Sequence, residues 1–268
     1  MKVKNNSKIA IVIFIYDSAS KYFINLVNSI NSQDFEDFEV VIFNDNVSDS
    51  WLFFKNLKVK YNIFNLVQDT PCGIRYQGFE ILKDLNFDFY IFQDCDDELS
   101  PSRVSDIISL SEKFKIIVND IDLINDSSEL LNSRIWKNRF INSPYFNFKN
   151  ILNYNFIGLG NTSLHKNLLK FLPNRPQQEI VALDWFIFYS ILKSTLIKGY
   201  FTSSCSTLYR QHTENQIGIA DIDKLNYILE IKNNFNILIG VKNTYQQSTN
   251  YKIPKKNNNN FPFWWELN

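Results

Sequence analysis

The sequence predicts an α/β fold of three layers, in which helices cover both faces of a mostly parallel central sheet. Short, continuous apolar runs, of which Ile9 to Ile15 is the first, are typical of strands buried on both faces. Segments with apolar residues at helical spacing separate these runs, so strand and helix alternate as in βαβ units. With 268 residues, of which 45% are hydrophobic, the chain can bury a sizeable core.

The first hundred residues supply four predicted strands and two predicted helices. The strands are expected over 9–15, 38–43, 59–67 and 87–92. One helix is expected over 73–85, and an earlier helix is indicated by apolar residues at helical spacing, Tyr22, Leu26, Val27 and Ile30. In sheets of this kind ligands bind beyond the carboxyl ends of the strands.

Beyond residue 100 the pattern continues and then weakens. The expected elements are a helix over 101–114, a strand over 115–119, a sheet element over 155–164, a helix over 180–192, a strand over 199–209 and an amphipathic helix over 221–240. Between 120 and 154, polar turns alternate with aromatic side chains. A lid over a pocket fits this stretch, but ordinary irregular packing is favoured, since aromatics usually fill cores.

Composition excludes several classes of function. The formal net charge is zero, so bulk electrostatics give no reason to expect nucleic acid as a partner. Three widely separated cysteines, Cys72, Cys95 and Cys205, fit neither a disulfide framework nor a zinc site and indicate a reducing compartment. The first apolar run is too short to span a bilayer and lacks a cleavage site after it, so a cytoplasmic protein is expected.

Acidic residues gather where the predicted strands end. The fourth strand runs directly into three carboxylates, those of Asp94, Asp96 and Asp97. Like charges this close to a buried strand cost free energy unless a cation or hydrogen-bond donors offset them. A bound divalent cation would explain the cluster. A solvated acidic turn explains this short segment equally well when it is considered by itself. Asp17 and Asp45 also follow predicted strands, and this convergence on one edge of the sheet favours a site.

Two further segments carry candidate chemistry. Asp184 lies in a strongly apolar helix, where it is either desolvated with a raised pKa or turned into a polar cavity. The alternative, that the Asp184 carboxylate binds at a helix cap or pairs with an arginine, fits the sequence equally well. Arg210 and His212 come directly after a predicted strand and suit an anion or a metal–phosphate pair. The alternative for them is a surface loop with an ordinary ion pair.

These motifs occur in a characteristic order. They are the opening Ile9–Asp49 segment with Asp45 in an acidic turn, then Arg75-Tyr76-Gln77-Gly78, Asp94-Cys95-Asp96, Leu183-Asp184-Trp185 and Tyr209-Arg210-Gln211-His212. In this order they resemble the family 2 glycosyltransferases with the GT-A fold over roughly residues 8–220. The resemblance is closest to the bacterial branch that includes rhamnosyltransferase-like enzymes. Asn44 and Val47 stand where the family usually has Asp and Ser, so the donor base is not fixed by the resemblance.

The resemblance implies a GT-A domain over 1–220, with a nucleotide-binding half over about 1–100 and an acceptor half over about 101–220. A C-terminal helix and aromatic tail follow over 221–268. The implied activity is an inverting, metal-dependent hexosyltransferase in bacterial surface polysaccharide or glycoconjugate assembly. The implied partners are a sugar donor of the UDP or dTDP type and a glycan or lipid-linked acceptor, reached in the cytoplasm or at the inner face of the membrane.

The resemblance also assigns roles to individual residues. Asp184 is expected to be the catalytic base, and Asp96 and His212 are expected to hold Mn²⁺ or Mg²⁺. The expected donor contacts are Tyr16, Asp17, Asp45, Arg75, Asp94 and Arg210. For the aromatic tail, Phe261 to Trp265, docking on its own domain is favoured over membrane contact or self-association.

Two other classes of function remain as alternatives. A sugar-nucleotide nucleotidyltransferase also uses carboxylates and Mg²⁺, but it would be expected to carry a glycine-rich, basic phosphate loop near the first strand. The stretch from Phe14 to Lys21 contains no glycine. A non-catalytic, carbohydrate-binding relative is the other alternative, and the presence of every acid that the chemistry requires argues against it.

Overall fold

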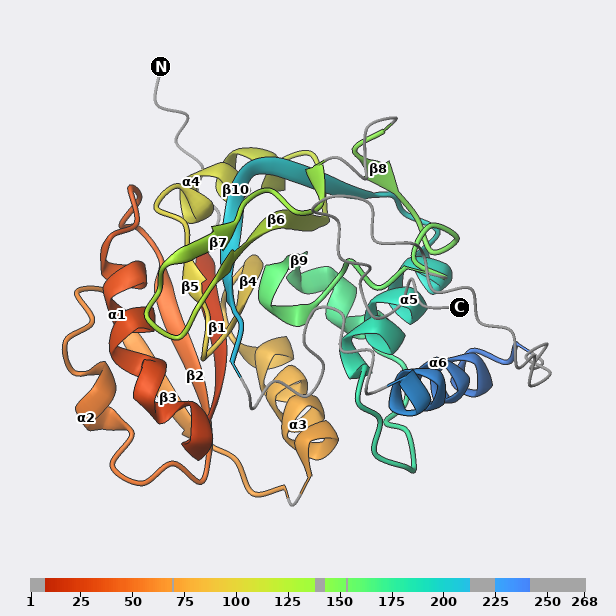
Figure 1. The fold of residues 1–268 in the computed structure, drawn as a ribbon, viewed down its shortest axis with the longest axis horizontal. Helices are drawn as coiled ribbons and strands as arrows, with labels where there is room; N and C mark the ends of the chain where they lie inside the picture. Colours follow the sequence, from red (N-terminus) through yellow and green to blue (C-terminus); the bar gives the residue numbers. More distant parts are fainter. Residues whose placement is uncertain (1–7, 69, 138–142, 153, 213–224, 242–268) are drawn as a thin grey trace.

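The computed structural model describes residues 8–68, 70–137, 143–152, 154–212 and 225–241. Within these residues one 10-stranded sheet forms the centre of the molecule (Figure 1). Its strands follow the order β3-β2-β1-β4-β9-β6-β10-β5, and β7 and β8 pair with β6 and β10. None of the helices in this described part combines the length and apolarity needed to cross a bilayer.

The first half of the sheet is parallel. It consists of β1 (Ile9–Tyr16), β2 (Glu39–Asp45), β3 (Tyr61–Asn65) and β4 (Phe89–Asp94). β1 pairs with β2 on one side and β4 on the other, and β2 pairs with β3. Because the strands are parallel, their carboxyl ends lie at one edge, as predicted: Asp45 is the register partner of Tyr16, and Asp94 is the partner of Phe14.

The second half of the sheet is mixed. Its strands are β5 (Glu98–Leu99), β6 (Ile116–Ile124), β7 (Leu130–Asn132), β8 (Tyr145–Phe146), β9 (Thr162–His165) and β10 (Gly199–Arg210). β9 lies antiparallel between β4 and β6, and β10 runs parallel to β6. The long strands β6 and β10 therefore run in the same direction as β4, and Arg210 ends at the same edge as Asp94.

Helices cover both faces of the sheet. One face carries the 3₁₀ helix η1 (Asp17–Tyr22), α1 (Phe23–Asn31), α2 (Trp51–Phe54) and α4 (Arg103–Ser111). The other face carries α3 (Pro71–Asp84), α5 (Leu183–Thr195) and α6 (Leu225–Leu238). Within β1, Ile11 and Ile13 pack in the core under α1 and α4, whereas Val12 and Phe14 pack in the core under α3 and α5. Burial on both faces explains the continuous apolar run and confirms the three-layer prediction.

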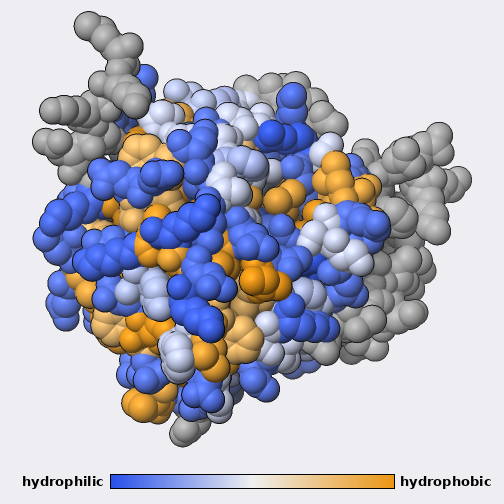
Figure 2. All heavy atoms as spheres, turned by 90° about the vertical axis from the view of Figure 1, so that its left-hand side faces the viewer, coloured by the Kyte–Doolittle hydropathy of each residue, from blue (hydrophilic) through white to orange (hydrophobic). Residues whose placement is uncertain are grey.

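The outer surface of α1 and α2 is mixed in character. Figure 2 shows this side of the molecule, where hydrophobic side chains are scattered among hydrophilic ones. The exposed apolar residues there include Ile24, Trp51 and Leu52. On the opposite face, α6 packs on α5, and the ring of Phe235 stacks on Trp185 at 3.8 Å.

Some boundaries differ from the sequence expectation. The strand expected over 115–119 continues to Ile124, because the sheet buries the polar side chains that suggested its end, Asn119 and Asp120. Of the element expected over 155–164, only the end forms β9, and a 3₁₀ turn, η3 (Leu159–Asn161), precedes it. In the weakly patterned stretch, Trp136 and Phe146 are buried, which agrees with packing. The aromatic tail lies outside the described residues.

Candidate active site

A pocket of about 150 Å³ lies between α3 and α5 at the carboxyl end of β4. Three charged side chains line it: Arg75 from α3, Asp94 from the end of β4 and Asp184 from the first turn of α5. The rest of the lining is apolar and consists of Phe79, Leu159, Val181, Leu183, Ile187 and Phe188. The topology therefore brings together two acids that are far apart in the sequence.

Arg75 and Asp94 form a loose pair in this pocket. Arg75 Nη2 lies 3.9 Å from Asp94 Oδ1, and the guanidinium lies 4.5 Å above the ring of Phe14. Arg75 Nη1 is buried and has no hydrogen-bond partner among the described residues. Burial raises the pKa of Asp94 to about 6, although the nearby Arg75 lowers it. A cation with a spare donor beside a pocket suits an anionic ligand.

Backbone donors hold Asp184. Its Oδ1 accepts from the Trp185 amide at 2.8 Å, and its Oδ2 accepts from the Leu159 amide at 3.2 Å. Burial raises the pKa of Asp184, and these two amides partly offset that effect. The carboxylate therefore lines the pocket and also accepts one amide from the first turn of its own helix and one from the start of η3. A fixed carboxylate with a raised pKa has the properties of a general base.

A short turn, residues 158–160, separates the two pocket acids. A Cβ at Gly160 would lie 2.9 Å from Asp94 Cγ, and still closer to Oδ2, so only glycine fits beside this carboxylate. The fully buried Arg103 donates to the Gly160 carbonyl at 2.8 Å and to the Phe92 carbonyl at 2.7 Å. Arg103 thus ties the turn to the end of β4, which fixes the gap between Asp94 and Asp184.

Asp96 and His212 meet beside this pocket edge. His212 Nε2 lies 3.1 Å from Asp96 Oδ2, and the Tyr16 hydroxyl donates to the same oxygen at 3.2 Å. Burial, together with Cys95 and the neighbouring aspartates, raises the pKa of Tyr16. The ends of β1, β4 and β10 therefore converge on one carboxylate oxygen.

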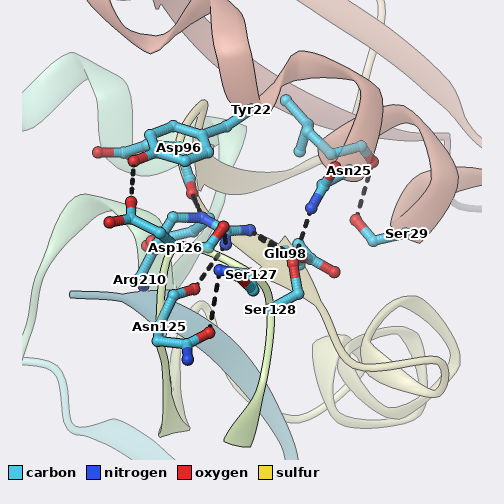
Figure 3. A network of polar contacts seen from close by, with 12 residues as sticks. Tyr22, Asn25, Ser29, Asp96, Glu98, Asn125, Asp126, Ser127, Ser128 and Arg210 are labelled. Carbon is cyan, nitrogen blue, oxygen red and sulfur yellow. Dashed lines mark hydrogen bonds and ion pairs between the residues drawn. The ribbon is translucent and has the colours of Figure 1, made fainter. Parts of the chain in front are cut away.

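The other predicted donor contacts lie in different surroundings. Asp17 is exposed at the start of η1, and Asp45 is half-buried and accepts from Asn46 Nδ2 at 3.1 Å. The guanidinium of Arg210 is completely buried and is held by protein acceptors (Figure 3). Its contact with the diphosphate stays a prediction, and within the protein its donors are already engaged by Glu98 and by backbone carbonyls.

One departure from the family pattern has a structural explanation. Asn44 is buried, and its Nδ2 donates to the Val47 carbonyl at 3.1 Å and to Asn65 Oδ1 at 2.8 Å. Its Oδ1 accepts from the Val47 amide at 2.9 Å. An amide can both donate and accept, so Asn44 shapes the turn before α2 in a way that a carboxylate could not.

Sequence reasoning missed several residues that shape the site. Arg103 carried a usable signal, because it is a charge on the apolar face of a predicted helix beside Val104 and Ile107. Tyr22 was assigned to a helix core, and nothing in its local sequence indicates a contact with His212. Gly160 gave no signal, since its neighbour Asp94 is distant in sequence.

The donor set of Asp96 and His212 fits a divalent cation bound together with a diphosphate. Mg²⁺ sites of this kind use one or two protein ligands and fill the remaining positions with phosphate oxygens and water. No group of three or more His, Cys, Asp or Glu side chains placed to hold a metal occurs in the described residues. A carboxylate oxygen and an imidazole nitrogen 3.1 Å apart can face the same ion.

Comparisons with known proteins identify the fold. The sequence matches no protein-family model and no curated protein. Among solved structures, a 1–349 fragment of S. aureus TarS in complex with UDP-GlcNAc has a TM-score of 0.61 at 17% identity, and the match covers 90% of this chain and 69% of that one. GalNAc-T7 with UDP, GalNAc and Mn²⁺ has a TM-score of 0.58 at 14% identity, covering 84% and 47%.

A longer structure of S. aureus TarS also matches, with a TM-score of 0.57 at 17% identity. That match covers 90% of this chain but 41% of the other. At such identities the likeness establishes the fold alone. The chain has the GT-A glycosyltransferase fold, which confirms the predicted fold class.

Proposed function

We propose that this GT-A protein is an inverting, metal-dependent glycosyltransferase that moves a sugar from a nucleotide-diphosphate donor to an acceptor hydroxyl. The observation that carries the proposal is the pocket at the end of β4, which Asp94 and Asp184 line together with Arg75 of α3. Its volume of about 150 Å³ is well below that of pockets for drug-sized ligands, ~300–1,000 Å³, and suits one sugar ring.

The donor is of the UDP or dTDP type. Two solved relatives of this fold hold UDP-GlcNAc or UDP, which supports a uridine nucleotide. Tyr16 and Asp45 are register partners at the sheet edge, and Arg75 offers a spare donor to the anionic part of the ligand. Asp17 and Asp94 complete the proposed donor contacts.

Mn²⁺ or Mg²⁺ would be held by Asp96 and His212. When bound, the cation neutralises charge on the leaving diphosphate. Tyr16 donates to the oxygen of Asp96 that also contacts His212, so it orients this carboxylate. We assign Arg210 to the support of this pair instead of to direct contact with the diphosphate, because its donors are held by protein groups.

Asp184 acts as the base. The acceptor oxygen attacks the anomeric carbon while its proton passes to Asp184, and the bond from that carbon to the diphosphate oxygen breaks. Attack opposite to the leaving group inverts the configuration. The amides of Leu159 and Trp185 hold the carboxylate in place throughout.

The biological setting follows the sequence resemblance. We propose a hexosyltransferase of the rhamnosyltransferase-like branch, in bacterial surface polysaccharide or glycoconjugate assembly. The acceptor is a glycan or a lipid-linked sugar, reached in the cytoplasm or at the inner face of the membrane.

The test uses a panel of nucleotide sugars with Mn²⁺ and measures free nucleoside diphosphate. Asp184→Asn should lower release about 10²- to 10⁴-fold, the typical contribution of a general base, and should leave donor binding unchanged. Asp106→Asn is the matched control, since Asp106 also lies in the first turn of a helix, α4, away from the pocket.

Three outcomes separate the candidate functions. Release of nucleoside diphosphate that requires Asp184 supports the glycosyltransferase. Release of pyrophosphate from a nucleoside triphosphate and a sugar phosphate would identify a nucleotidyltransferase instead. Sugar binding without turnover under any donor, with Asp184→Asn behaving like the unaltered protein, would identify a carbohydrate-binding relative.

A further inference from the structure

A polar network centred on Arg210 lies beside Asp96 (Figure 3). The side chain of Asp96 also contacts His212. The acceptors of Arg210 are the Asp96 carbonyl at 2.8 Å from Nε, the Asn125 and Asp126 carbonyls at 2.8 and 3.0 Å from Nη1, and Glu98 Oε1 and Ser128 Oγ at 2.5 and 3.2 Å from Nη2. A guanidinium has five N–H donors, so this set engages all of them. Arg210 therefore ties the segment that carries Asp96 to the turn between β6 and β7.

That turn, residues 125–129 and here called the hairpin turn, has a fixed shape. Asn125 Oδ1 accepts from the amides of Ser127 and Glu129, each at 2.9 Å. Ser128 has a φ of 64°, a left-handed conformation that serine rarely adopts. Its hydroxyl accepts from Asn25 Nδ2 at 2.7 Å and donates to Glu98 at 2.5 Å, which holds it there.

Tyr22 connects the hairpin turn to the metal-binding pair. Its hydroxyl donates a short hydrogen bond to Asp126 Oδ1. Its ring lies 4.6 Å from the guanidinium carbon of Arg210 and 5.3 Å from the ring of His212. One side chain thus touches the hairpin turn, the central arginine and the histidine.

We propose that Tyr22 and Asp126 are positioning residues that hold the His212 imidazole against Asp96 for the divalent cation. The inference rests on the proposed function, because it needs a cation at this pair. The imidazole contacts Asp96 Oδ2 at 3.1 Å and also packs near the Tyr22 ring, with the two ring centroids 5.3 Å apart. The Tyr22–Asp126 hydrogen bond fixes that ring, and Arg210 fixes the backbone two residues before the histidine.

The exposure of Asp126 makes the idea testable. Asp126 is on the surface, so its removal leaves the core packing intact. Tyr22 is buried, but Tyr22→Phe keeps the ring and deletes only the hydroxyl. Loss of either end of one hydrogen bond should therefore loosen the histidine without unfolding the protein.

The experiment titrates Mn²⁺ into the full chain, alone and with UDP, and follows free Mn²⁺ by electron paramagnetic resonance. Tyr22→Phe and Asp126→Ala should each weaken Mn²⁺ binding about tenfold, the lower end for partners that orient metal ligands. The double variant should bind like either single variant, because both changes delete the same bond. The melting temperature should fall by no more than a few degrees, since one hydrogen bond contributes about 1 kcal/mol.

Asp88→Ala is the matched control. Asp88 is exposed like Asp126, and it accepts a hydrogen bond at 2.9 Å from the Lys8 amide at the opposite end of β4. Its removal should leave Mn²⁺ binding unchanged. Equal Mn²⁺ affinity for Tyr22→Phe, Asp126→Ala and the unaltered protein would overturn the inference and leave the glycosyltransferase standing. An unaltered protein that binds no Mn²⁺, alone or with UDP, and turns over equally well without it would overturn the inference and the metal dependence together.

Discussion

Arg75 and Arg210 both lie at the carboxyl edge of the sheet, yet their surroundings differ in kind. Arg75 keeps 25% of its side chain exposed, approaches Asp94 only to 3.9 Å and has a buried Nη1 with no partner among the described residues. Arg210 is completely buried, and protein acceptors engage every donor. Because an unsatisfied buried group costs free energy, the pocket is suited to a ligand and the network to holding a shape.

The largest expected effect comes from replacing each of the two arginines with methionine in turn. Arg210→Met removes the ion pair of the half-buried Glu98 and leaves the carbonyls of Asp96, Asn125 and Asp126 without this donor, so it should lower the free energy of unfolding by about 3–5 kcal/mol. Arg75→Met should cost less than about 1 kcal/mol, since its pair with Asp94 is long and partly exposed. It should instead weaken nucleotide binding about 10- to 100-fold, the range for hydrogen bonds to charged groups.

Chemical denaturation and calorimetry with nucleoside diphosphates measure both quantities for both variants. The comparison between the two regions fails if Arg75→Met is the more destabilised protein, or if Arg210→Met folds stably and loses only nucleotide affinity.

A second comparison concerns two acids with raised pKa values, the half-buried Asp184 in the pocket and the fully buried Asp120 in the sheet. Asp120 Oδ1 accepts from the amides of Ile121 and Trp136 at 2.9 and 2.7 Å, and Oδ2 has no hydrogen-bond partner in the described residues. Burial raises the pKa of Asp120 to about 6, and Asp122 adds to this while Arg134 opposes it. Asp120 does not line the pocket of the candidate site.

Asp120 should therefore make stability depend on pH. A raised folded pKa means that the folded state binds the proton first, so the contribution is complete below about pH 4 and is lost as pH rises through about 6. At ~1.4 kcal/mol per pKa unit, the contribution is at most about 3 kcal/mol. Asp120→Asn should remove it, so the stability difference between the two proteins should change across this range in urea titrations. A constant difference would show that Asp120 does not titrate there.

How far the sequence predicts this molecule depends on the range of the contacts involved. The strands β1, β2 and β4 follow from local apolar runs. Short motifs single out Asp94, Asp96, Asp184 and His212 as candidates, and their roles stay predictions. The environment of Arg210 could not be predicted, because the same residues after a strand are compatible with an exposed arginine or a buried one. The acceptors that bury it come from the hairpin turn, which lies more than eighty residues earlier in the chain.

The third prediction tests the gap between Asp94 and Asp184. Gly160→Ala places a methyl group against the Asp94 carboxylate, whereas Gly158→Ala meets its nearest neighbour, Asn161 Oδ1, at 3.3 Å. A displacement of about 1 Å at a reacting centre can cost ~10²-fold in rate, and that loss is expected for Gly160→Ala. Gly158→Ala should retain most of its activity. Steady-state turnover and melting temperature separate lost geometry from lost folding, and equal rates for the two variants would contradict the role of the turn.

The smallest expected effect is the pH dependence of turnover, which bears on whether Asp184 is the base. The base must be ionised to accept a proton, and burial raises the pKa of Asp184, so kcat should fall on the acid side through a pKa above the usual ~3.9 of aspartate. The fall should be at most about tenfold per pH unit, because a single proton is involved. Measured with the same donor and metal, the residual rate of Asp184→Asn should be flat over the same range. An acid limb that persists in Asp184→Asn would assign the titration to another group in the pocket, and the contrast between a reactive Asp184 and a sealed Asp120 would no longer hold.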